Sequence, residues 1–239
     1  MSTVGIEHNS FSYQIANMST KPMKLYGHVQ GPNPWKVAII LEELGVPYET
    51  EYMDFGDLKK EPFLSKNPNG RTPALEDPNT GVTTWESGAI IDYLLDVYDK
   101  QHKLSYTESP QKYEQICWRD FQMSGQGPYF GQKAWFTHFH SEKGITSAIE
   151  RYGKEIDRVQ SVIDAHLTKT GNEYLVGNKV SYADLMFVPW NAMLGFIHPD
   201  FEKEWKSKYP KSYEWNQKLI ARPAVKKCLD EKAKKMGGG

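Results

Sequence analysis

The sequence predicts an α/β domain over residues 23–101, followed by an all-α domain over residues 110–236. Two observations lead to this fold class. In the first part, short β-compatible runs alternate with helical patterns in the order β-α-β-α-β-β-α. In the second part the strand signals disappear, and one helical pattern follows another. We therefore expect a small mixed sheet with helices packed on it, joined to a helical bundle.

The first elements of the chain form a β-α-β unit. Residues 23–26 are β-compatible, and a helix is expected to begin near Asn33 and to end at Gly45. Its apolar positions recur at helical spacing: Val37, Ile40, Leu41 and Leu44. Residues 48–53 then alternate as a strand, and a short basic helix that includes Lys59 and Lys60 is expected to follow.

Residues 67–91 hold the densest set of structural signals. Two turns rich in Asn, Pro and Gly enclose a strand that begins at Pro73, and residues 82–85 form its hairpin partner. Glu86 and Ser87 follow, where helical spacing of apolar residues begins. Free backbone N–H groups and the positive end of the dipole can receive a carboxylate or phosphate at such a helix start. These elements complete a thioredoxin-like layer of helices on a sheet.

The second part of the chain contains several helical patterns. Residues 111–140 are aromatic-rich and interrupted by glycines and a proline, whereas residues 145–167 are strongly periodic. Ser181 and Asp184 form an S-x-x-D capping box at the start of another helix. The last helices are expected to begin or break at prolines: Pro210 and Pro223.

The composition narrows the class of protein. The chain has 239 residues, and 29 Lys and Arg nearly balance 30 Asp and Glu, so no overall charge favours nucleic acid or an anionic membrane. Cys117 and Cys228 lack a metal-ligand spacing, and neither a disulfide framework nor a metal is expected. Residues 1–22 lack a secretory or mitochondrial pattern, which favours a flexible extension and a cytoplasmic protein.

Several motifs together identify a family. The runs N-P-x-G-R-T-P-A-L and W-E-S-G-A-I-I-D-Y-L, with P-N-P-W-K-V-A-I-I-L-E-E-L-G before them, resemble the glutathione-binding half of cytosolic glutathione transferases. F-Q-M-S-G-Q-G-P-Y-F-G-Q, A-I-E-R-Y and V-S-Y-A-D-L-M-F-V-P-W-N extend the resemblance through the helical part. The motifs are most similar to the fungal branch related to the yeast nitrogen-regulating prion protein and to the bacterial nu-class enzymes.

The resemblance implies a glutathione site. Pro73 would be cis, Thr72 would pair with the glutathione backbone, and Glu86 and Ser87 would hold the glutamyl end. Arg71 is a further candidate, which can pair with a glutathione carboxylate. Glutathione would be a co-substrate, without a metal. The resemblance also implies a homodimer, in which Arg151 reaches glutathione bound to the neighbouring subunit.

The thiol of glutathione needs activation, because a thiol with a pKa of about 8.5 is only a few per cent thiolate at neutral pH. Lowering that pKa by about two requires roughly 2.7 kcal/mol. A helix end contributes at most about 2 kcal/mol and a hydrogen bond to a charged acceptor about 1.5–3. The amide of Asn33, at the entrance of the first helix, is therefore sufficient. The Tyr26 hydroxyl is the alternative donor, or Tyr26 is simply a strand aromatic.

An acceptor site is expected where the entrance of the first helix faces the long helical run. Small, polar and aromatic side chains there suit a small hydrophobic electrophile or a disulfide. The candidates are Gln122, Ser124, Pro128, Gln132 and Trp135. Cys117 is expected to be buried rather than reactive.

Two classes of function follow. The first is a glutathione transferase that conjugates electrophiles, with disulfide reductase or peroxidase activity as possible additions. The second is a glutathione-binding regulatory protein that sequesters a transcription factor in nitrogen control. The yeast regulator carries a long Asn/Gln-rich segment before its fold, whereas about twenty ordinary residues precede the fold here. This difference favours the enzyme.

Overall fold

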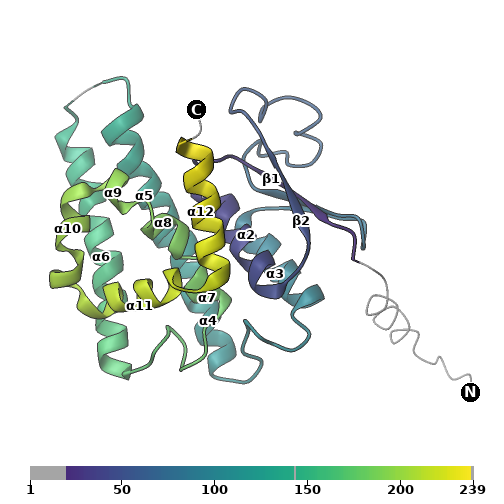
Figure 1. Cartoon of the computed structure of the whole chain (residues 1–239). Helices are drawn as coiled ribbons and strands as arrows, with labels where there is room; N and C mark the ends of the chain where they lie inside the picture. The colour runs from purple at the N-terminus through teal and green to yellow at the C-terminus, as the bar shows by residue number, and fades with distance from the viewer. Residues whose placement is uncertain (1–19, 143, 238–239) are drawn as a thin grey trace, which may run out of the picture.

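A computed structural model describes residues 20–142 and 144–237, and Figure 1 shows the helical part beside a small sheet. Residues 1–19, most of the expected extension, lie outside the described residues. The sheet has the order β2-β1-β3-β4 and contains β1 (Met23–Gly27), β2 (Tyr48–Tyr52), β3 (Ala74–Asp77) and β4 (Val82–Trp85). β1 is parallel to β2 and antiparallel to β3, and β3 and β4 form the predicted hairpin.

Two helices pack on this sheet: α2 (Pro32–Leu44) and α3 (Ser87–Tyr98). α2 ends as predicted at Gly45, whose φ of 69° is left-handed and suits glycine. The helix is buried on nearly all sides, because α3, α7, α8 and α12 pack around it as well as the sheet. It therefore belongs to the common core of both parts of the chain.

The short helix expected around Lys59 and Lys60 is wrong. Residues 55–66 form successive turns, which a few backbone hydrogen bonds hold together. Pro62 lies in the middle of this segment and has no N–H to donate, so a continuous helical ladder cannot pass through it. The rest of the α/β order is as predicted.

The long run of the helical part is continuous rather than interrupted. It comprises α4 (Gln111–Phe121), the π-helical η1 (Gln122–Gln126), α5 (Gly127–Ala134) and the π-helical η2 (Trp135–Phe139). Wider turns replace the expected breaks. Gly131 packs closely against another helix, because a Cβ there would lie 3.2 Å from the Trp190 ring.

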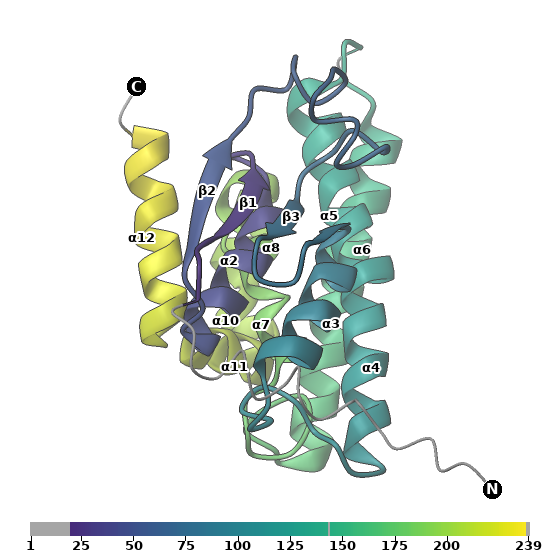
Figure 2. The ribbon, with the colours of Figure 1, turned by 90° about the vertical axis from the view of Figure 1, so that its right-hand side faces the viewer.

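The remaining helices follow the predicted starts at Pro210 and Pro223. They are α6 (Thr146–Thr170), α7 (Tyr182–Leu185), α8 (Val188–Asn191), α9 (Leu194–Ile197), α10 (Pro199–Lys208), α11 (Pro210–Ile220) and α12 (Pro223–Gly237). The capping box is confirmed, since the Ser181 N–H donates to Asp184 Oδ2 at 2.9 Å. Figure 2 shows α12 alongside β2, where Tyr52 donates to Glu231. The domain boundary between residues 101 and 110 stays a prediction.

Candidate functional site

A small pocket lies where the start of α2, the loop before β3 and the start of α3 meet η1. Its volume is about 110 Å³, and it is lined by Asn33, Asn67, Asn69, Arg71, Thr72, Pro73, Glu86, Ser87 and Met123. Every residue predicted for the glutathione site except Arg151 is in this lining. Asn67, Asn69 and Met123 also line the pocket, and the sequence does not predict them.

The loop before β3 is shaped by its own hydrogen bonds. The buried Asn67 side chain donates to the Arg71 carbonyl at 2.5 Å and accepts the Asn69 N–H at 2.9 Å. Lys59 donates to the Asn69 carbonyl at 2.6 Å. Gly70 has a φ of 57°, and a Cβ there would lie 2.6 Å from a backbone oxygen. These contacts hold Arg71 at the pocket rim.

The next residues of the loop also follow the resemblance. The Thr72–Pro73 peptide bond is cis, as expected. Both residues line the pocket, and β3 begins directly after them. Thr72 therefore lies between the Arg71 rim and the sheet.

The start of α3 forms another wall of the pocket. Glu86 has a φ of 69° and a ψ of 121°, an uncommon conformation for a residue with a side chain. Such conformations cluster at functional sites. The Asn69 side chain donates to Glu86 Oε1 at 3.3 Å. Ser87 is buried at the first position of the helix, where its N–H and the dipole favour an anion.

Asn33 lies in the first turn of α2, and its amide has a defined orientation. Its Oδ1 accepts the indole N–H of Trp190 at 3.2 Å. Because an indole nitrogen can only donate, the partner atom is the amide oxygen. The NH₂ group is therefore the end of Asn33 left to donate to a ligand.

Tyr26, the alternative donor, is engaged inside the sheet. Its hydroxyl donates to Glu76 Oε2 at 2.6 Å, and its ring packs against Phe63. Only 3% of the residue is exposed, and burial raises the pKa of the hydroxyl. Tyr26 is not among the pocket-lining residues. This arrangement is that of a strand aromatic.

Arg151 is not brought to the pocket within the single chain. It lies on α6, and its exposed side chain is 3.4 Å from Glu155. The expected contact with a neighbouring subunit requires an outward-facing side chain, which Arg151 has.

The acceptor candidates divide into two groups. Gln122 departs from expectation, because it is fully buried and its amide is used in bonds to Lys36 and Gln126. The other four are exposed and recur every three or four residues along the run from η1 to η2: Ser124, Pro128, Gln132 and Trp135.

Cys117 was expected to be buried, and this expectation is wrong. The residue is exposed, because it lies on the outer face of α4.

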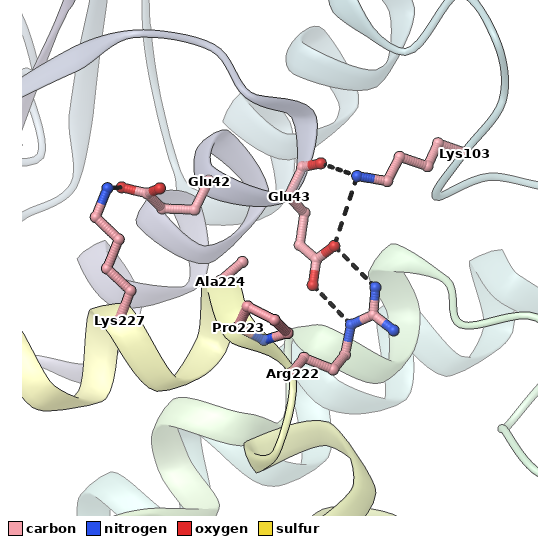
Figure 3. Close-up of a pocket in the computed structure, with 7 residues that line it drawn as sticks. All are labelled: Glu42, Glu43, Lys103, Arg222, Pro223, Ala224 and Lys227. Atoms are coloured by element: carbon pink, nitrogen blue, oxygen red, sulfur yellow. Dashed lines mark hydrogen bonds and ion pairs between the residues drawn. The ribbon is translucent and has the colours of Figure 1, made fainter.

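A larger cavity, of about 450 Å³, lies at the opposite end of α2 (Figure 3). Its charges are matched internally. Arg222 donates to both carboxylate oxygens of Glu43 at 2.6 and 2.8 Å, and Lys227 lies 2.7 Å from Glu42. Paired groups of this kind leave little charge for a ligand, so the cavity is a structural junction between α2 and α12.

Other kinds of site have no support in the described residues. No helix within residues 20–142 and 144–237 is both long and apolar enough to span a membrane. The same residues contain no group of three or more His, Cys, Asp or Glu side chains placed to hold a metal ion.

The chain is similar to known proteins over most of its length. Residues 21–96 match the glutathione S-transferase N-terminal domain, and residues 128–223 match the C-terminal domain. It is 50% identical to the glutathione S-transferase-like protein OpS6 of Beauveria bassiana, covering 90% of this chain and 98% of that protein.

Two further relatives define the branch. The transcriptional regulator URE2 of Saccharomyces cerevisiae is 36% identical, over 94% of this chain and 72% of that protein. The crystal structure of the glutathione transferase URE2P6 from Phanerochaete chrysosporium, in complex with oxidized glutathione, is 46% identical with a TM-score of 0.84, covering 90% of this chain and 97% of that one. The chain therefore belongs to the glutathione S-transferase family, in the branch of the URE2-type proteins.

Proposed function

We propose that this glutathione transferase binds reduced glutathione in the pocket between α2 and α3 and activates its thiol for attack on small electrophiles. The observation that carries the proposal is the meeting of Asn33 with the Glu86–Ser87 pair in one pocket. The glutamyl end of glutathione has an ammonium and a carboxylate. Glu86 matches the ammonium, and the start of α3 at Ser87 matches the carboxylate.

The size of the pocket supports a partly enclosed tripeptide. Small-molecule sites usually have about 300–1,000 Å³. The pocket has about 110 Å³, which suits the glutamyl end alone. The rest of the tripeptide would lie over Thr72 and Arg71 towards Asn33, which places the sulfur near the free NH₂ group.

Thiol activation needs a donor that favours the thiolate. The Asn33 amide and the first turn of α2 together supply about 2–4 kcal/mol, enough to lower the thiol pKa by about two. Tyr26 is unsuited because its hydroxyl already donates to Glu76.

The acceptor would be a small hydrophobic electrophile, a disulfide or a hydroperoxide. The exposed run that includes Gln132 and Trp135 offers apolar and polar surface for it. The URE2P6 neighbour is a complex with oxidized glutathione, which favours disulfide chemistry as well as conjugation. Such activities belong to detoxification and to the response to oxidative stress.

The proposed assembly is a cytoplasmic homodimer, without nucleic acid, membrane or metal partners. Its support is the exposed side chain of Arg151, which could reach glutathione in the partner subunit. Sedimentation at micromolar concentration should give a dimer. Arg151→Ala should weaken glutathione binding and leave the dimer intact. A wild-type monomer with intact glutathione affinity would overturn this part of the proposal.

A second candidate function is regulation by protein binding. It is favoured by the similarity to the transcriptional regulator URE2. A glutathione-binding regulator would bind the tripeptide through the same pocket and turn over no electrophile, so turnover separates the two candidates.

Calorimetric titration with reduced glutathione tests the proposal, followed by three assays: conjugation to 1-chloro-2,4-dinitrobenzene, reduction of bis(2-hydroxyethyl) disulfide and reduction of cumene hydroperoxide. Binding with turnover in at least one assay supports the enzyme. Binding without turnover in any assay supports the regulator. Absence of binding overturns both.

A further inference from the structure

Lys36 is a lysine in the core of the protein, one turn along α2 from Asn33. Only 2% of the residue is exposed. Its Nζ donates to Gln122 Oε1 at 2.7 Å and lies 3.7 Å from Met123 Sδ. Within residues 20–142 and 144–237, no carboxylate forms an ion pair with it.

A buried ammonium without a carboxylate partner is costly, because it has lost its hydration and gained only a neutral acceptor. Burial lowers the pKa of Lys36 to about 7, and the charge of Glu86 opposes this change in part. Gln122, Met123 and Asn33 are neutral, and the other elements packed on α2 place no charge near enough to change this pKa. Lys36 is therefore poised between its neutral and charged forms.

Hydrogen bonds among the neighbouring amide side chains leave only an oxygen facing Lys36, so Lys36 acts as a hydrogen-bond donor. Gln122 uses its NH₂ group to donate to Gln126 Oε1 at 2.9 Å, and Gln126 donates to Asn191 Oδ1 at 2.8 Å. This chain of donors turns the Gln122 oxygen towards Lys36. An anion would be a far stronger partner for the remaining N–H groups of the ammonium.

The place where an anion can approach is the pocket. Met123 lines the pocket, and its Sδ lies 3.7 Å from Lys36 Nζ and also 3.7 Å from Ser87 Oγ. A Cβ on Gly88 would meet the same Met123 side chain at 3.5 Å. A single thioether therefore separates the buried Lys36 from the start of α3, where an anion is favoured.

We propose that Lys36 is the buried counter-charge of the glutamyl α-carboxylate and that it takes up a proton when glutathione binds. This assignment rests on the proposed function. The ligand carboxylate at Ser87 supplies the negative charge that Lys36 lacks in the free protein. The proton moves from solvent to Lys36 Nζ, no covalent bond changes, and glutathione binding becomes dependent on pH.

The test uses S-methylglutathione, because its sulfur carries no proton and cannot contribute to the proton balance. Calorimetry at pH 7.5, in two buffers with different ionisation enthalpies, counts the protons taken up. Wild-type protein should take up on the order of half a proton per ligand. Its affinity should fall several-fold between pH 7 and 8, as the free protein loses the Lys36 proton.

Two matched comparisons locate the effect. Lys36→Met should abolish the uptake and weaken binding at pH 6.5 about tenfold, the size of a partly screened charge pair. Lys232→Met is the control, since Lys232 is another buried lysine whose pKa burial lowers to about 8, on α12 and outside the pocket lining. It should leave uptake and affinity unchanged. The S-methylated peptide with 4-aminobutanoyl in place of γ-glutamyl lacks the α-carboxylate and should bind without proton uptake.

The outcomes separate this assignment from the proposed function. Equal proton uptake in wild-type protein and a folded Lys36→Met variant would overturn the assignment, as would unchanged uptake with the 4-aminobutanoyl peptide. If the wild-type protein binds neither reduced glutathione nor S-methylglutathione, the proposed function itself is overturned.

Discussion

The indole N–H of Trp190, on α8 of the helical part, donates to the side-chain oxygen of Asn33, on α2 of the α/β part, across 3.2 Å. The contact joins residues that are far apart in the sequence. It determines which end of the Asn33 amide remains for the ligand. The helical part therefore orients the proposed donor, besides carrying the proposed acceptor surface.

Trp190→Phe should lower turnover more than it lowers glutathione affinity. The phenyl ring keeps most of the packing but lacks the N–H, so the amide of Asn33 becomes free to rotate. We expect the thiolate to lose on the order of 1 kcal/mol of stabilisation, with a rise in the pKa of bound glutathione and a several-fold fall in kcat. Thiolate absorbance measured against pH provides the readout.

Trp205→Phe is the matched control for this prediction, because it also removes a buried indole bond, to Ser212, away from the pocket. If both variants have the wild-type thiol pKa, the orientation of Asn33 does not depend on Trp190.

Asn33→Ala should raise the pKa of bound glutathione and lower kcat more than it weakens binding. The lost hydrogen bond favours the thiolate and the transition state over the bound thiol. Tyr26→Phe should change the thiol pKa much less, because the Tyr26 hydroxyl is committed to Glu76. A larger rise in Tyr26→Phe than in Asn33→Ala would contradict the choice of donor.

Glu86→Ala should weaken binding of reduced glutathione by about ten- to a hundredfold, since a charge-assisted bond contributes about 1.5–3 kcal/mol. Glu86→Gly should weaken binding equally but give a protein more stable than Glu86→Ala by about 1 kcal/mol. Glycine adopts the observed φ of 69° without the penalty that a Cβ brings. Calorimetry and chemical denaturation measure the two effects, and unchanged affinity in both variants would refute the role of Glu86.

Lys36→Met should stabilise the free protein most at low pH. The pKa of Lys36 falls from 10.5 to about 7 on folding, so below about pH 7 both states carry the charge and the native state bears the cost of burying it. Between pH 7 and 10.5 the unfolded state binds the extra proton, and wild-type stability rises by up to about 1.4 kcal/mol per pH unit relative to the variant. Denaturation at pH 6, 7.5 and 9 should show the advantage of Lys36→Met shrinking; an advantage independent of pH would contradict the buried charge.

Local signals were enough to predict the elements that form the pocket, whereas the glutathione-binding roles of its residues came from the family resemblance. The turn before Pro73, the hairpin and the helix start at Ser87 each depend on residues within a few positions of one another, and all are present in the structure. Gly45 likewise ended α2 as predicted. The predicted helix around Lys59 does not form, because Pro62 lacks the backbone N–H that a helix needs there.

Contacts between distant segments could not be predicted in this way. Lys36 lies in an apolar helix, and a lysine there is expected to reach solvent. It is buried because other helices pack around α2, and its Nζ contacts Gln122 and Met123, from η1. For the same reason the sequence predicts an acceptor position for Gln122, although its amide forms hydrogen bonds inside the protein.

α2 is fastened to the helical part at both ends. In its first turn, Asn33 accepts a hydrogen bond from Trp190. In its last turn, Glu43 accepts two hydrogen bonds from Arg222 (Figure 3). Because α2 is bonded to the helical part at both ends, α2 and the sheet cannot rotate as a unit relative to the helical part about the linker near residue 105. Motions that admit a substrate must therefore come from loops and side chains at the pocket rim. Cleaving the chain near residue 105 would separate α2 from the helices that bury it. Neither fragment should therefore fold independently.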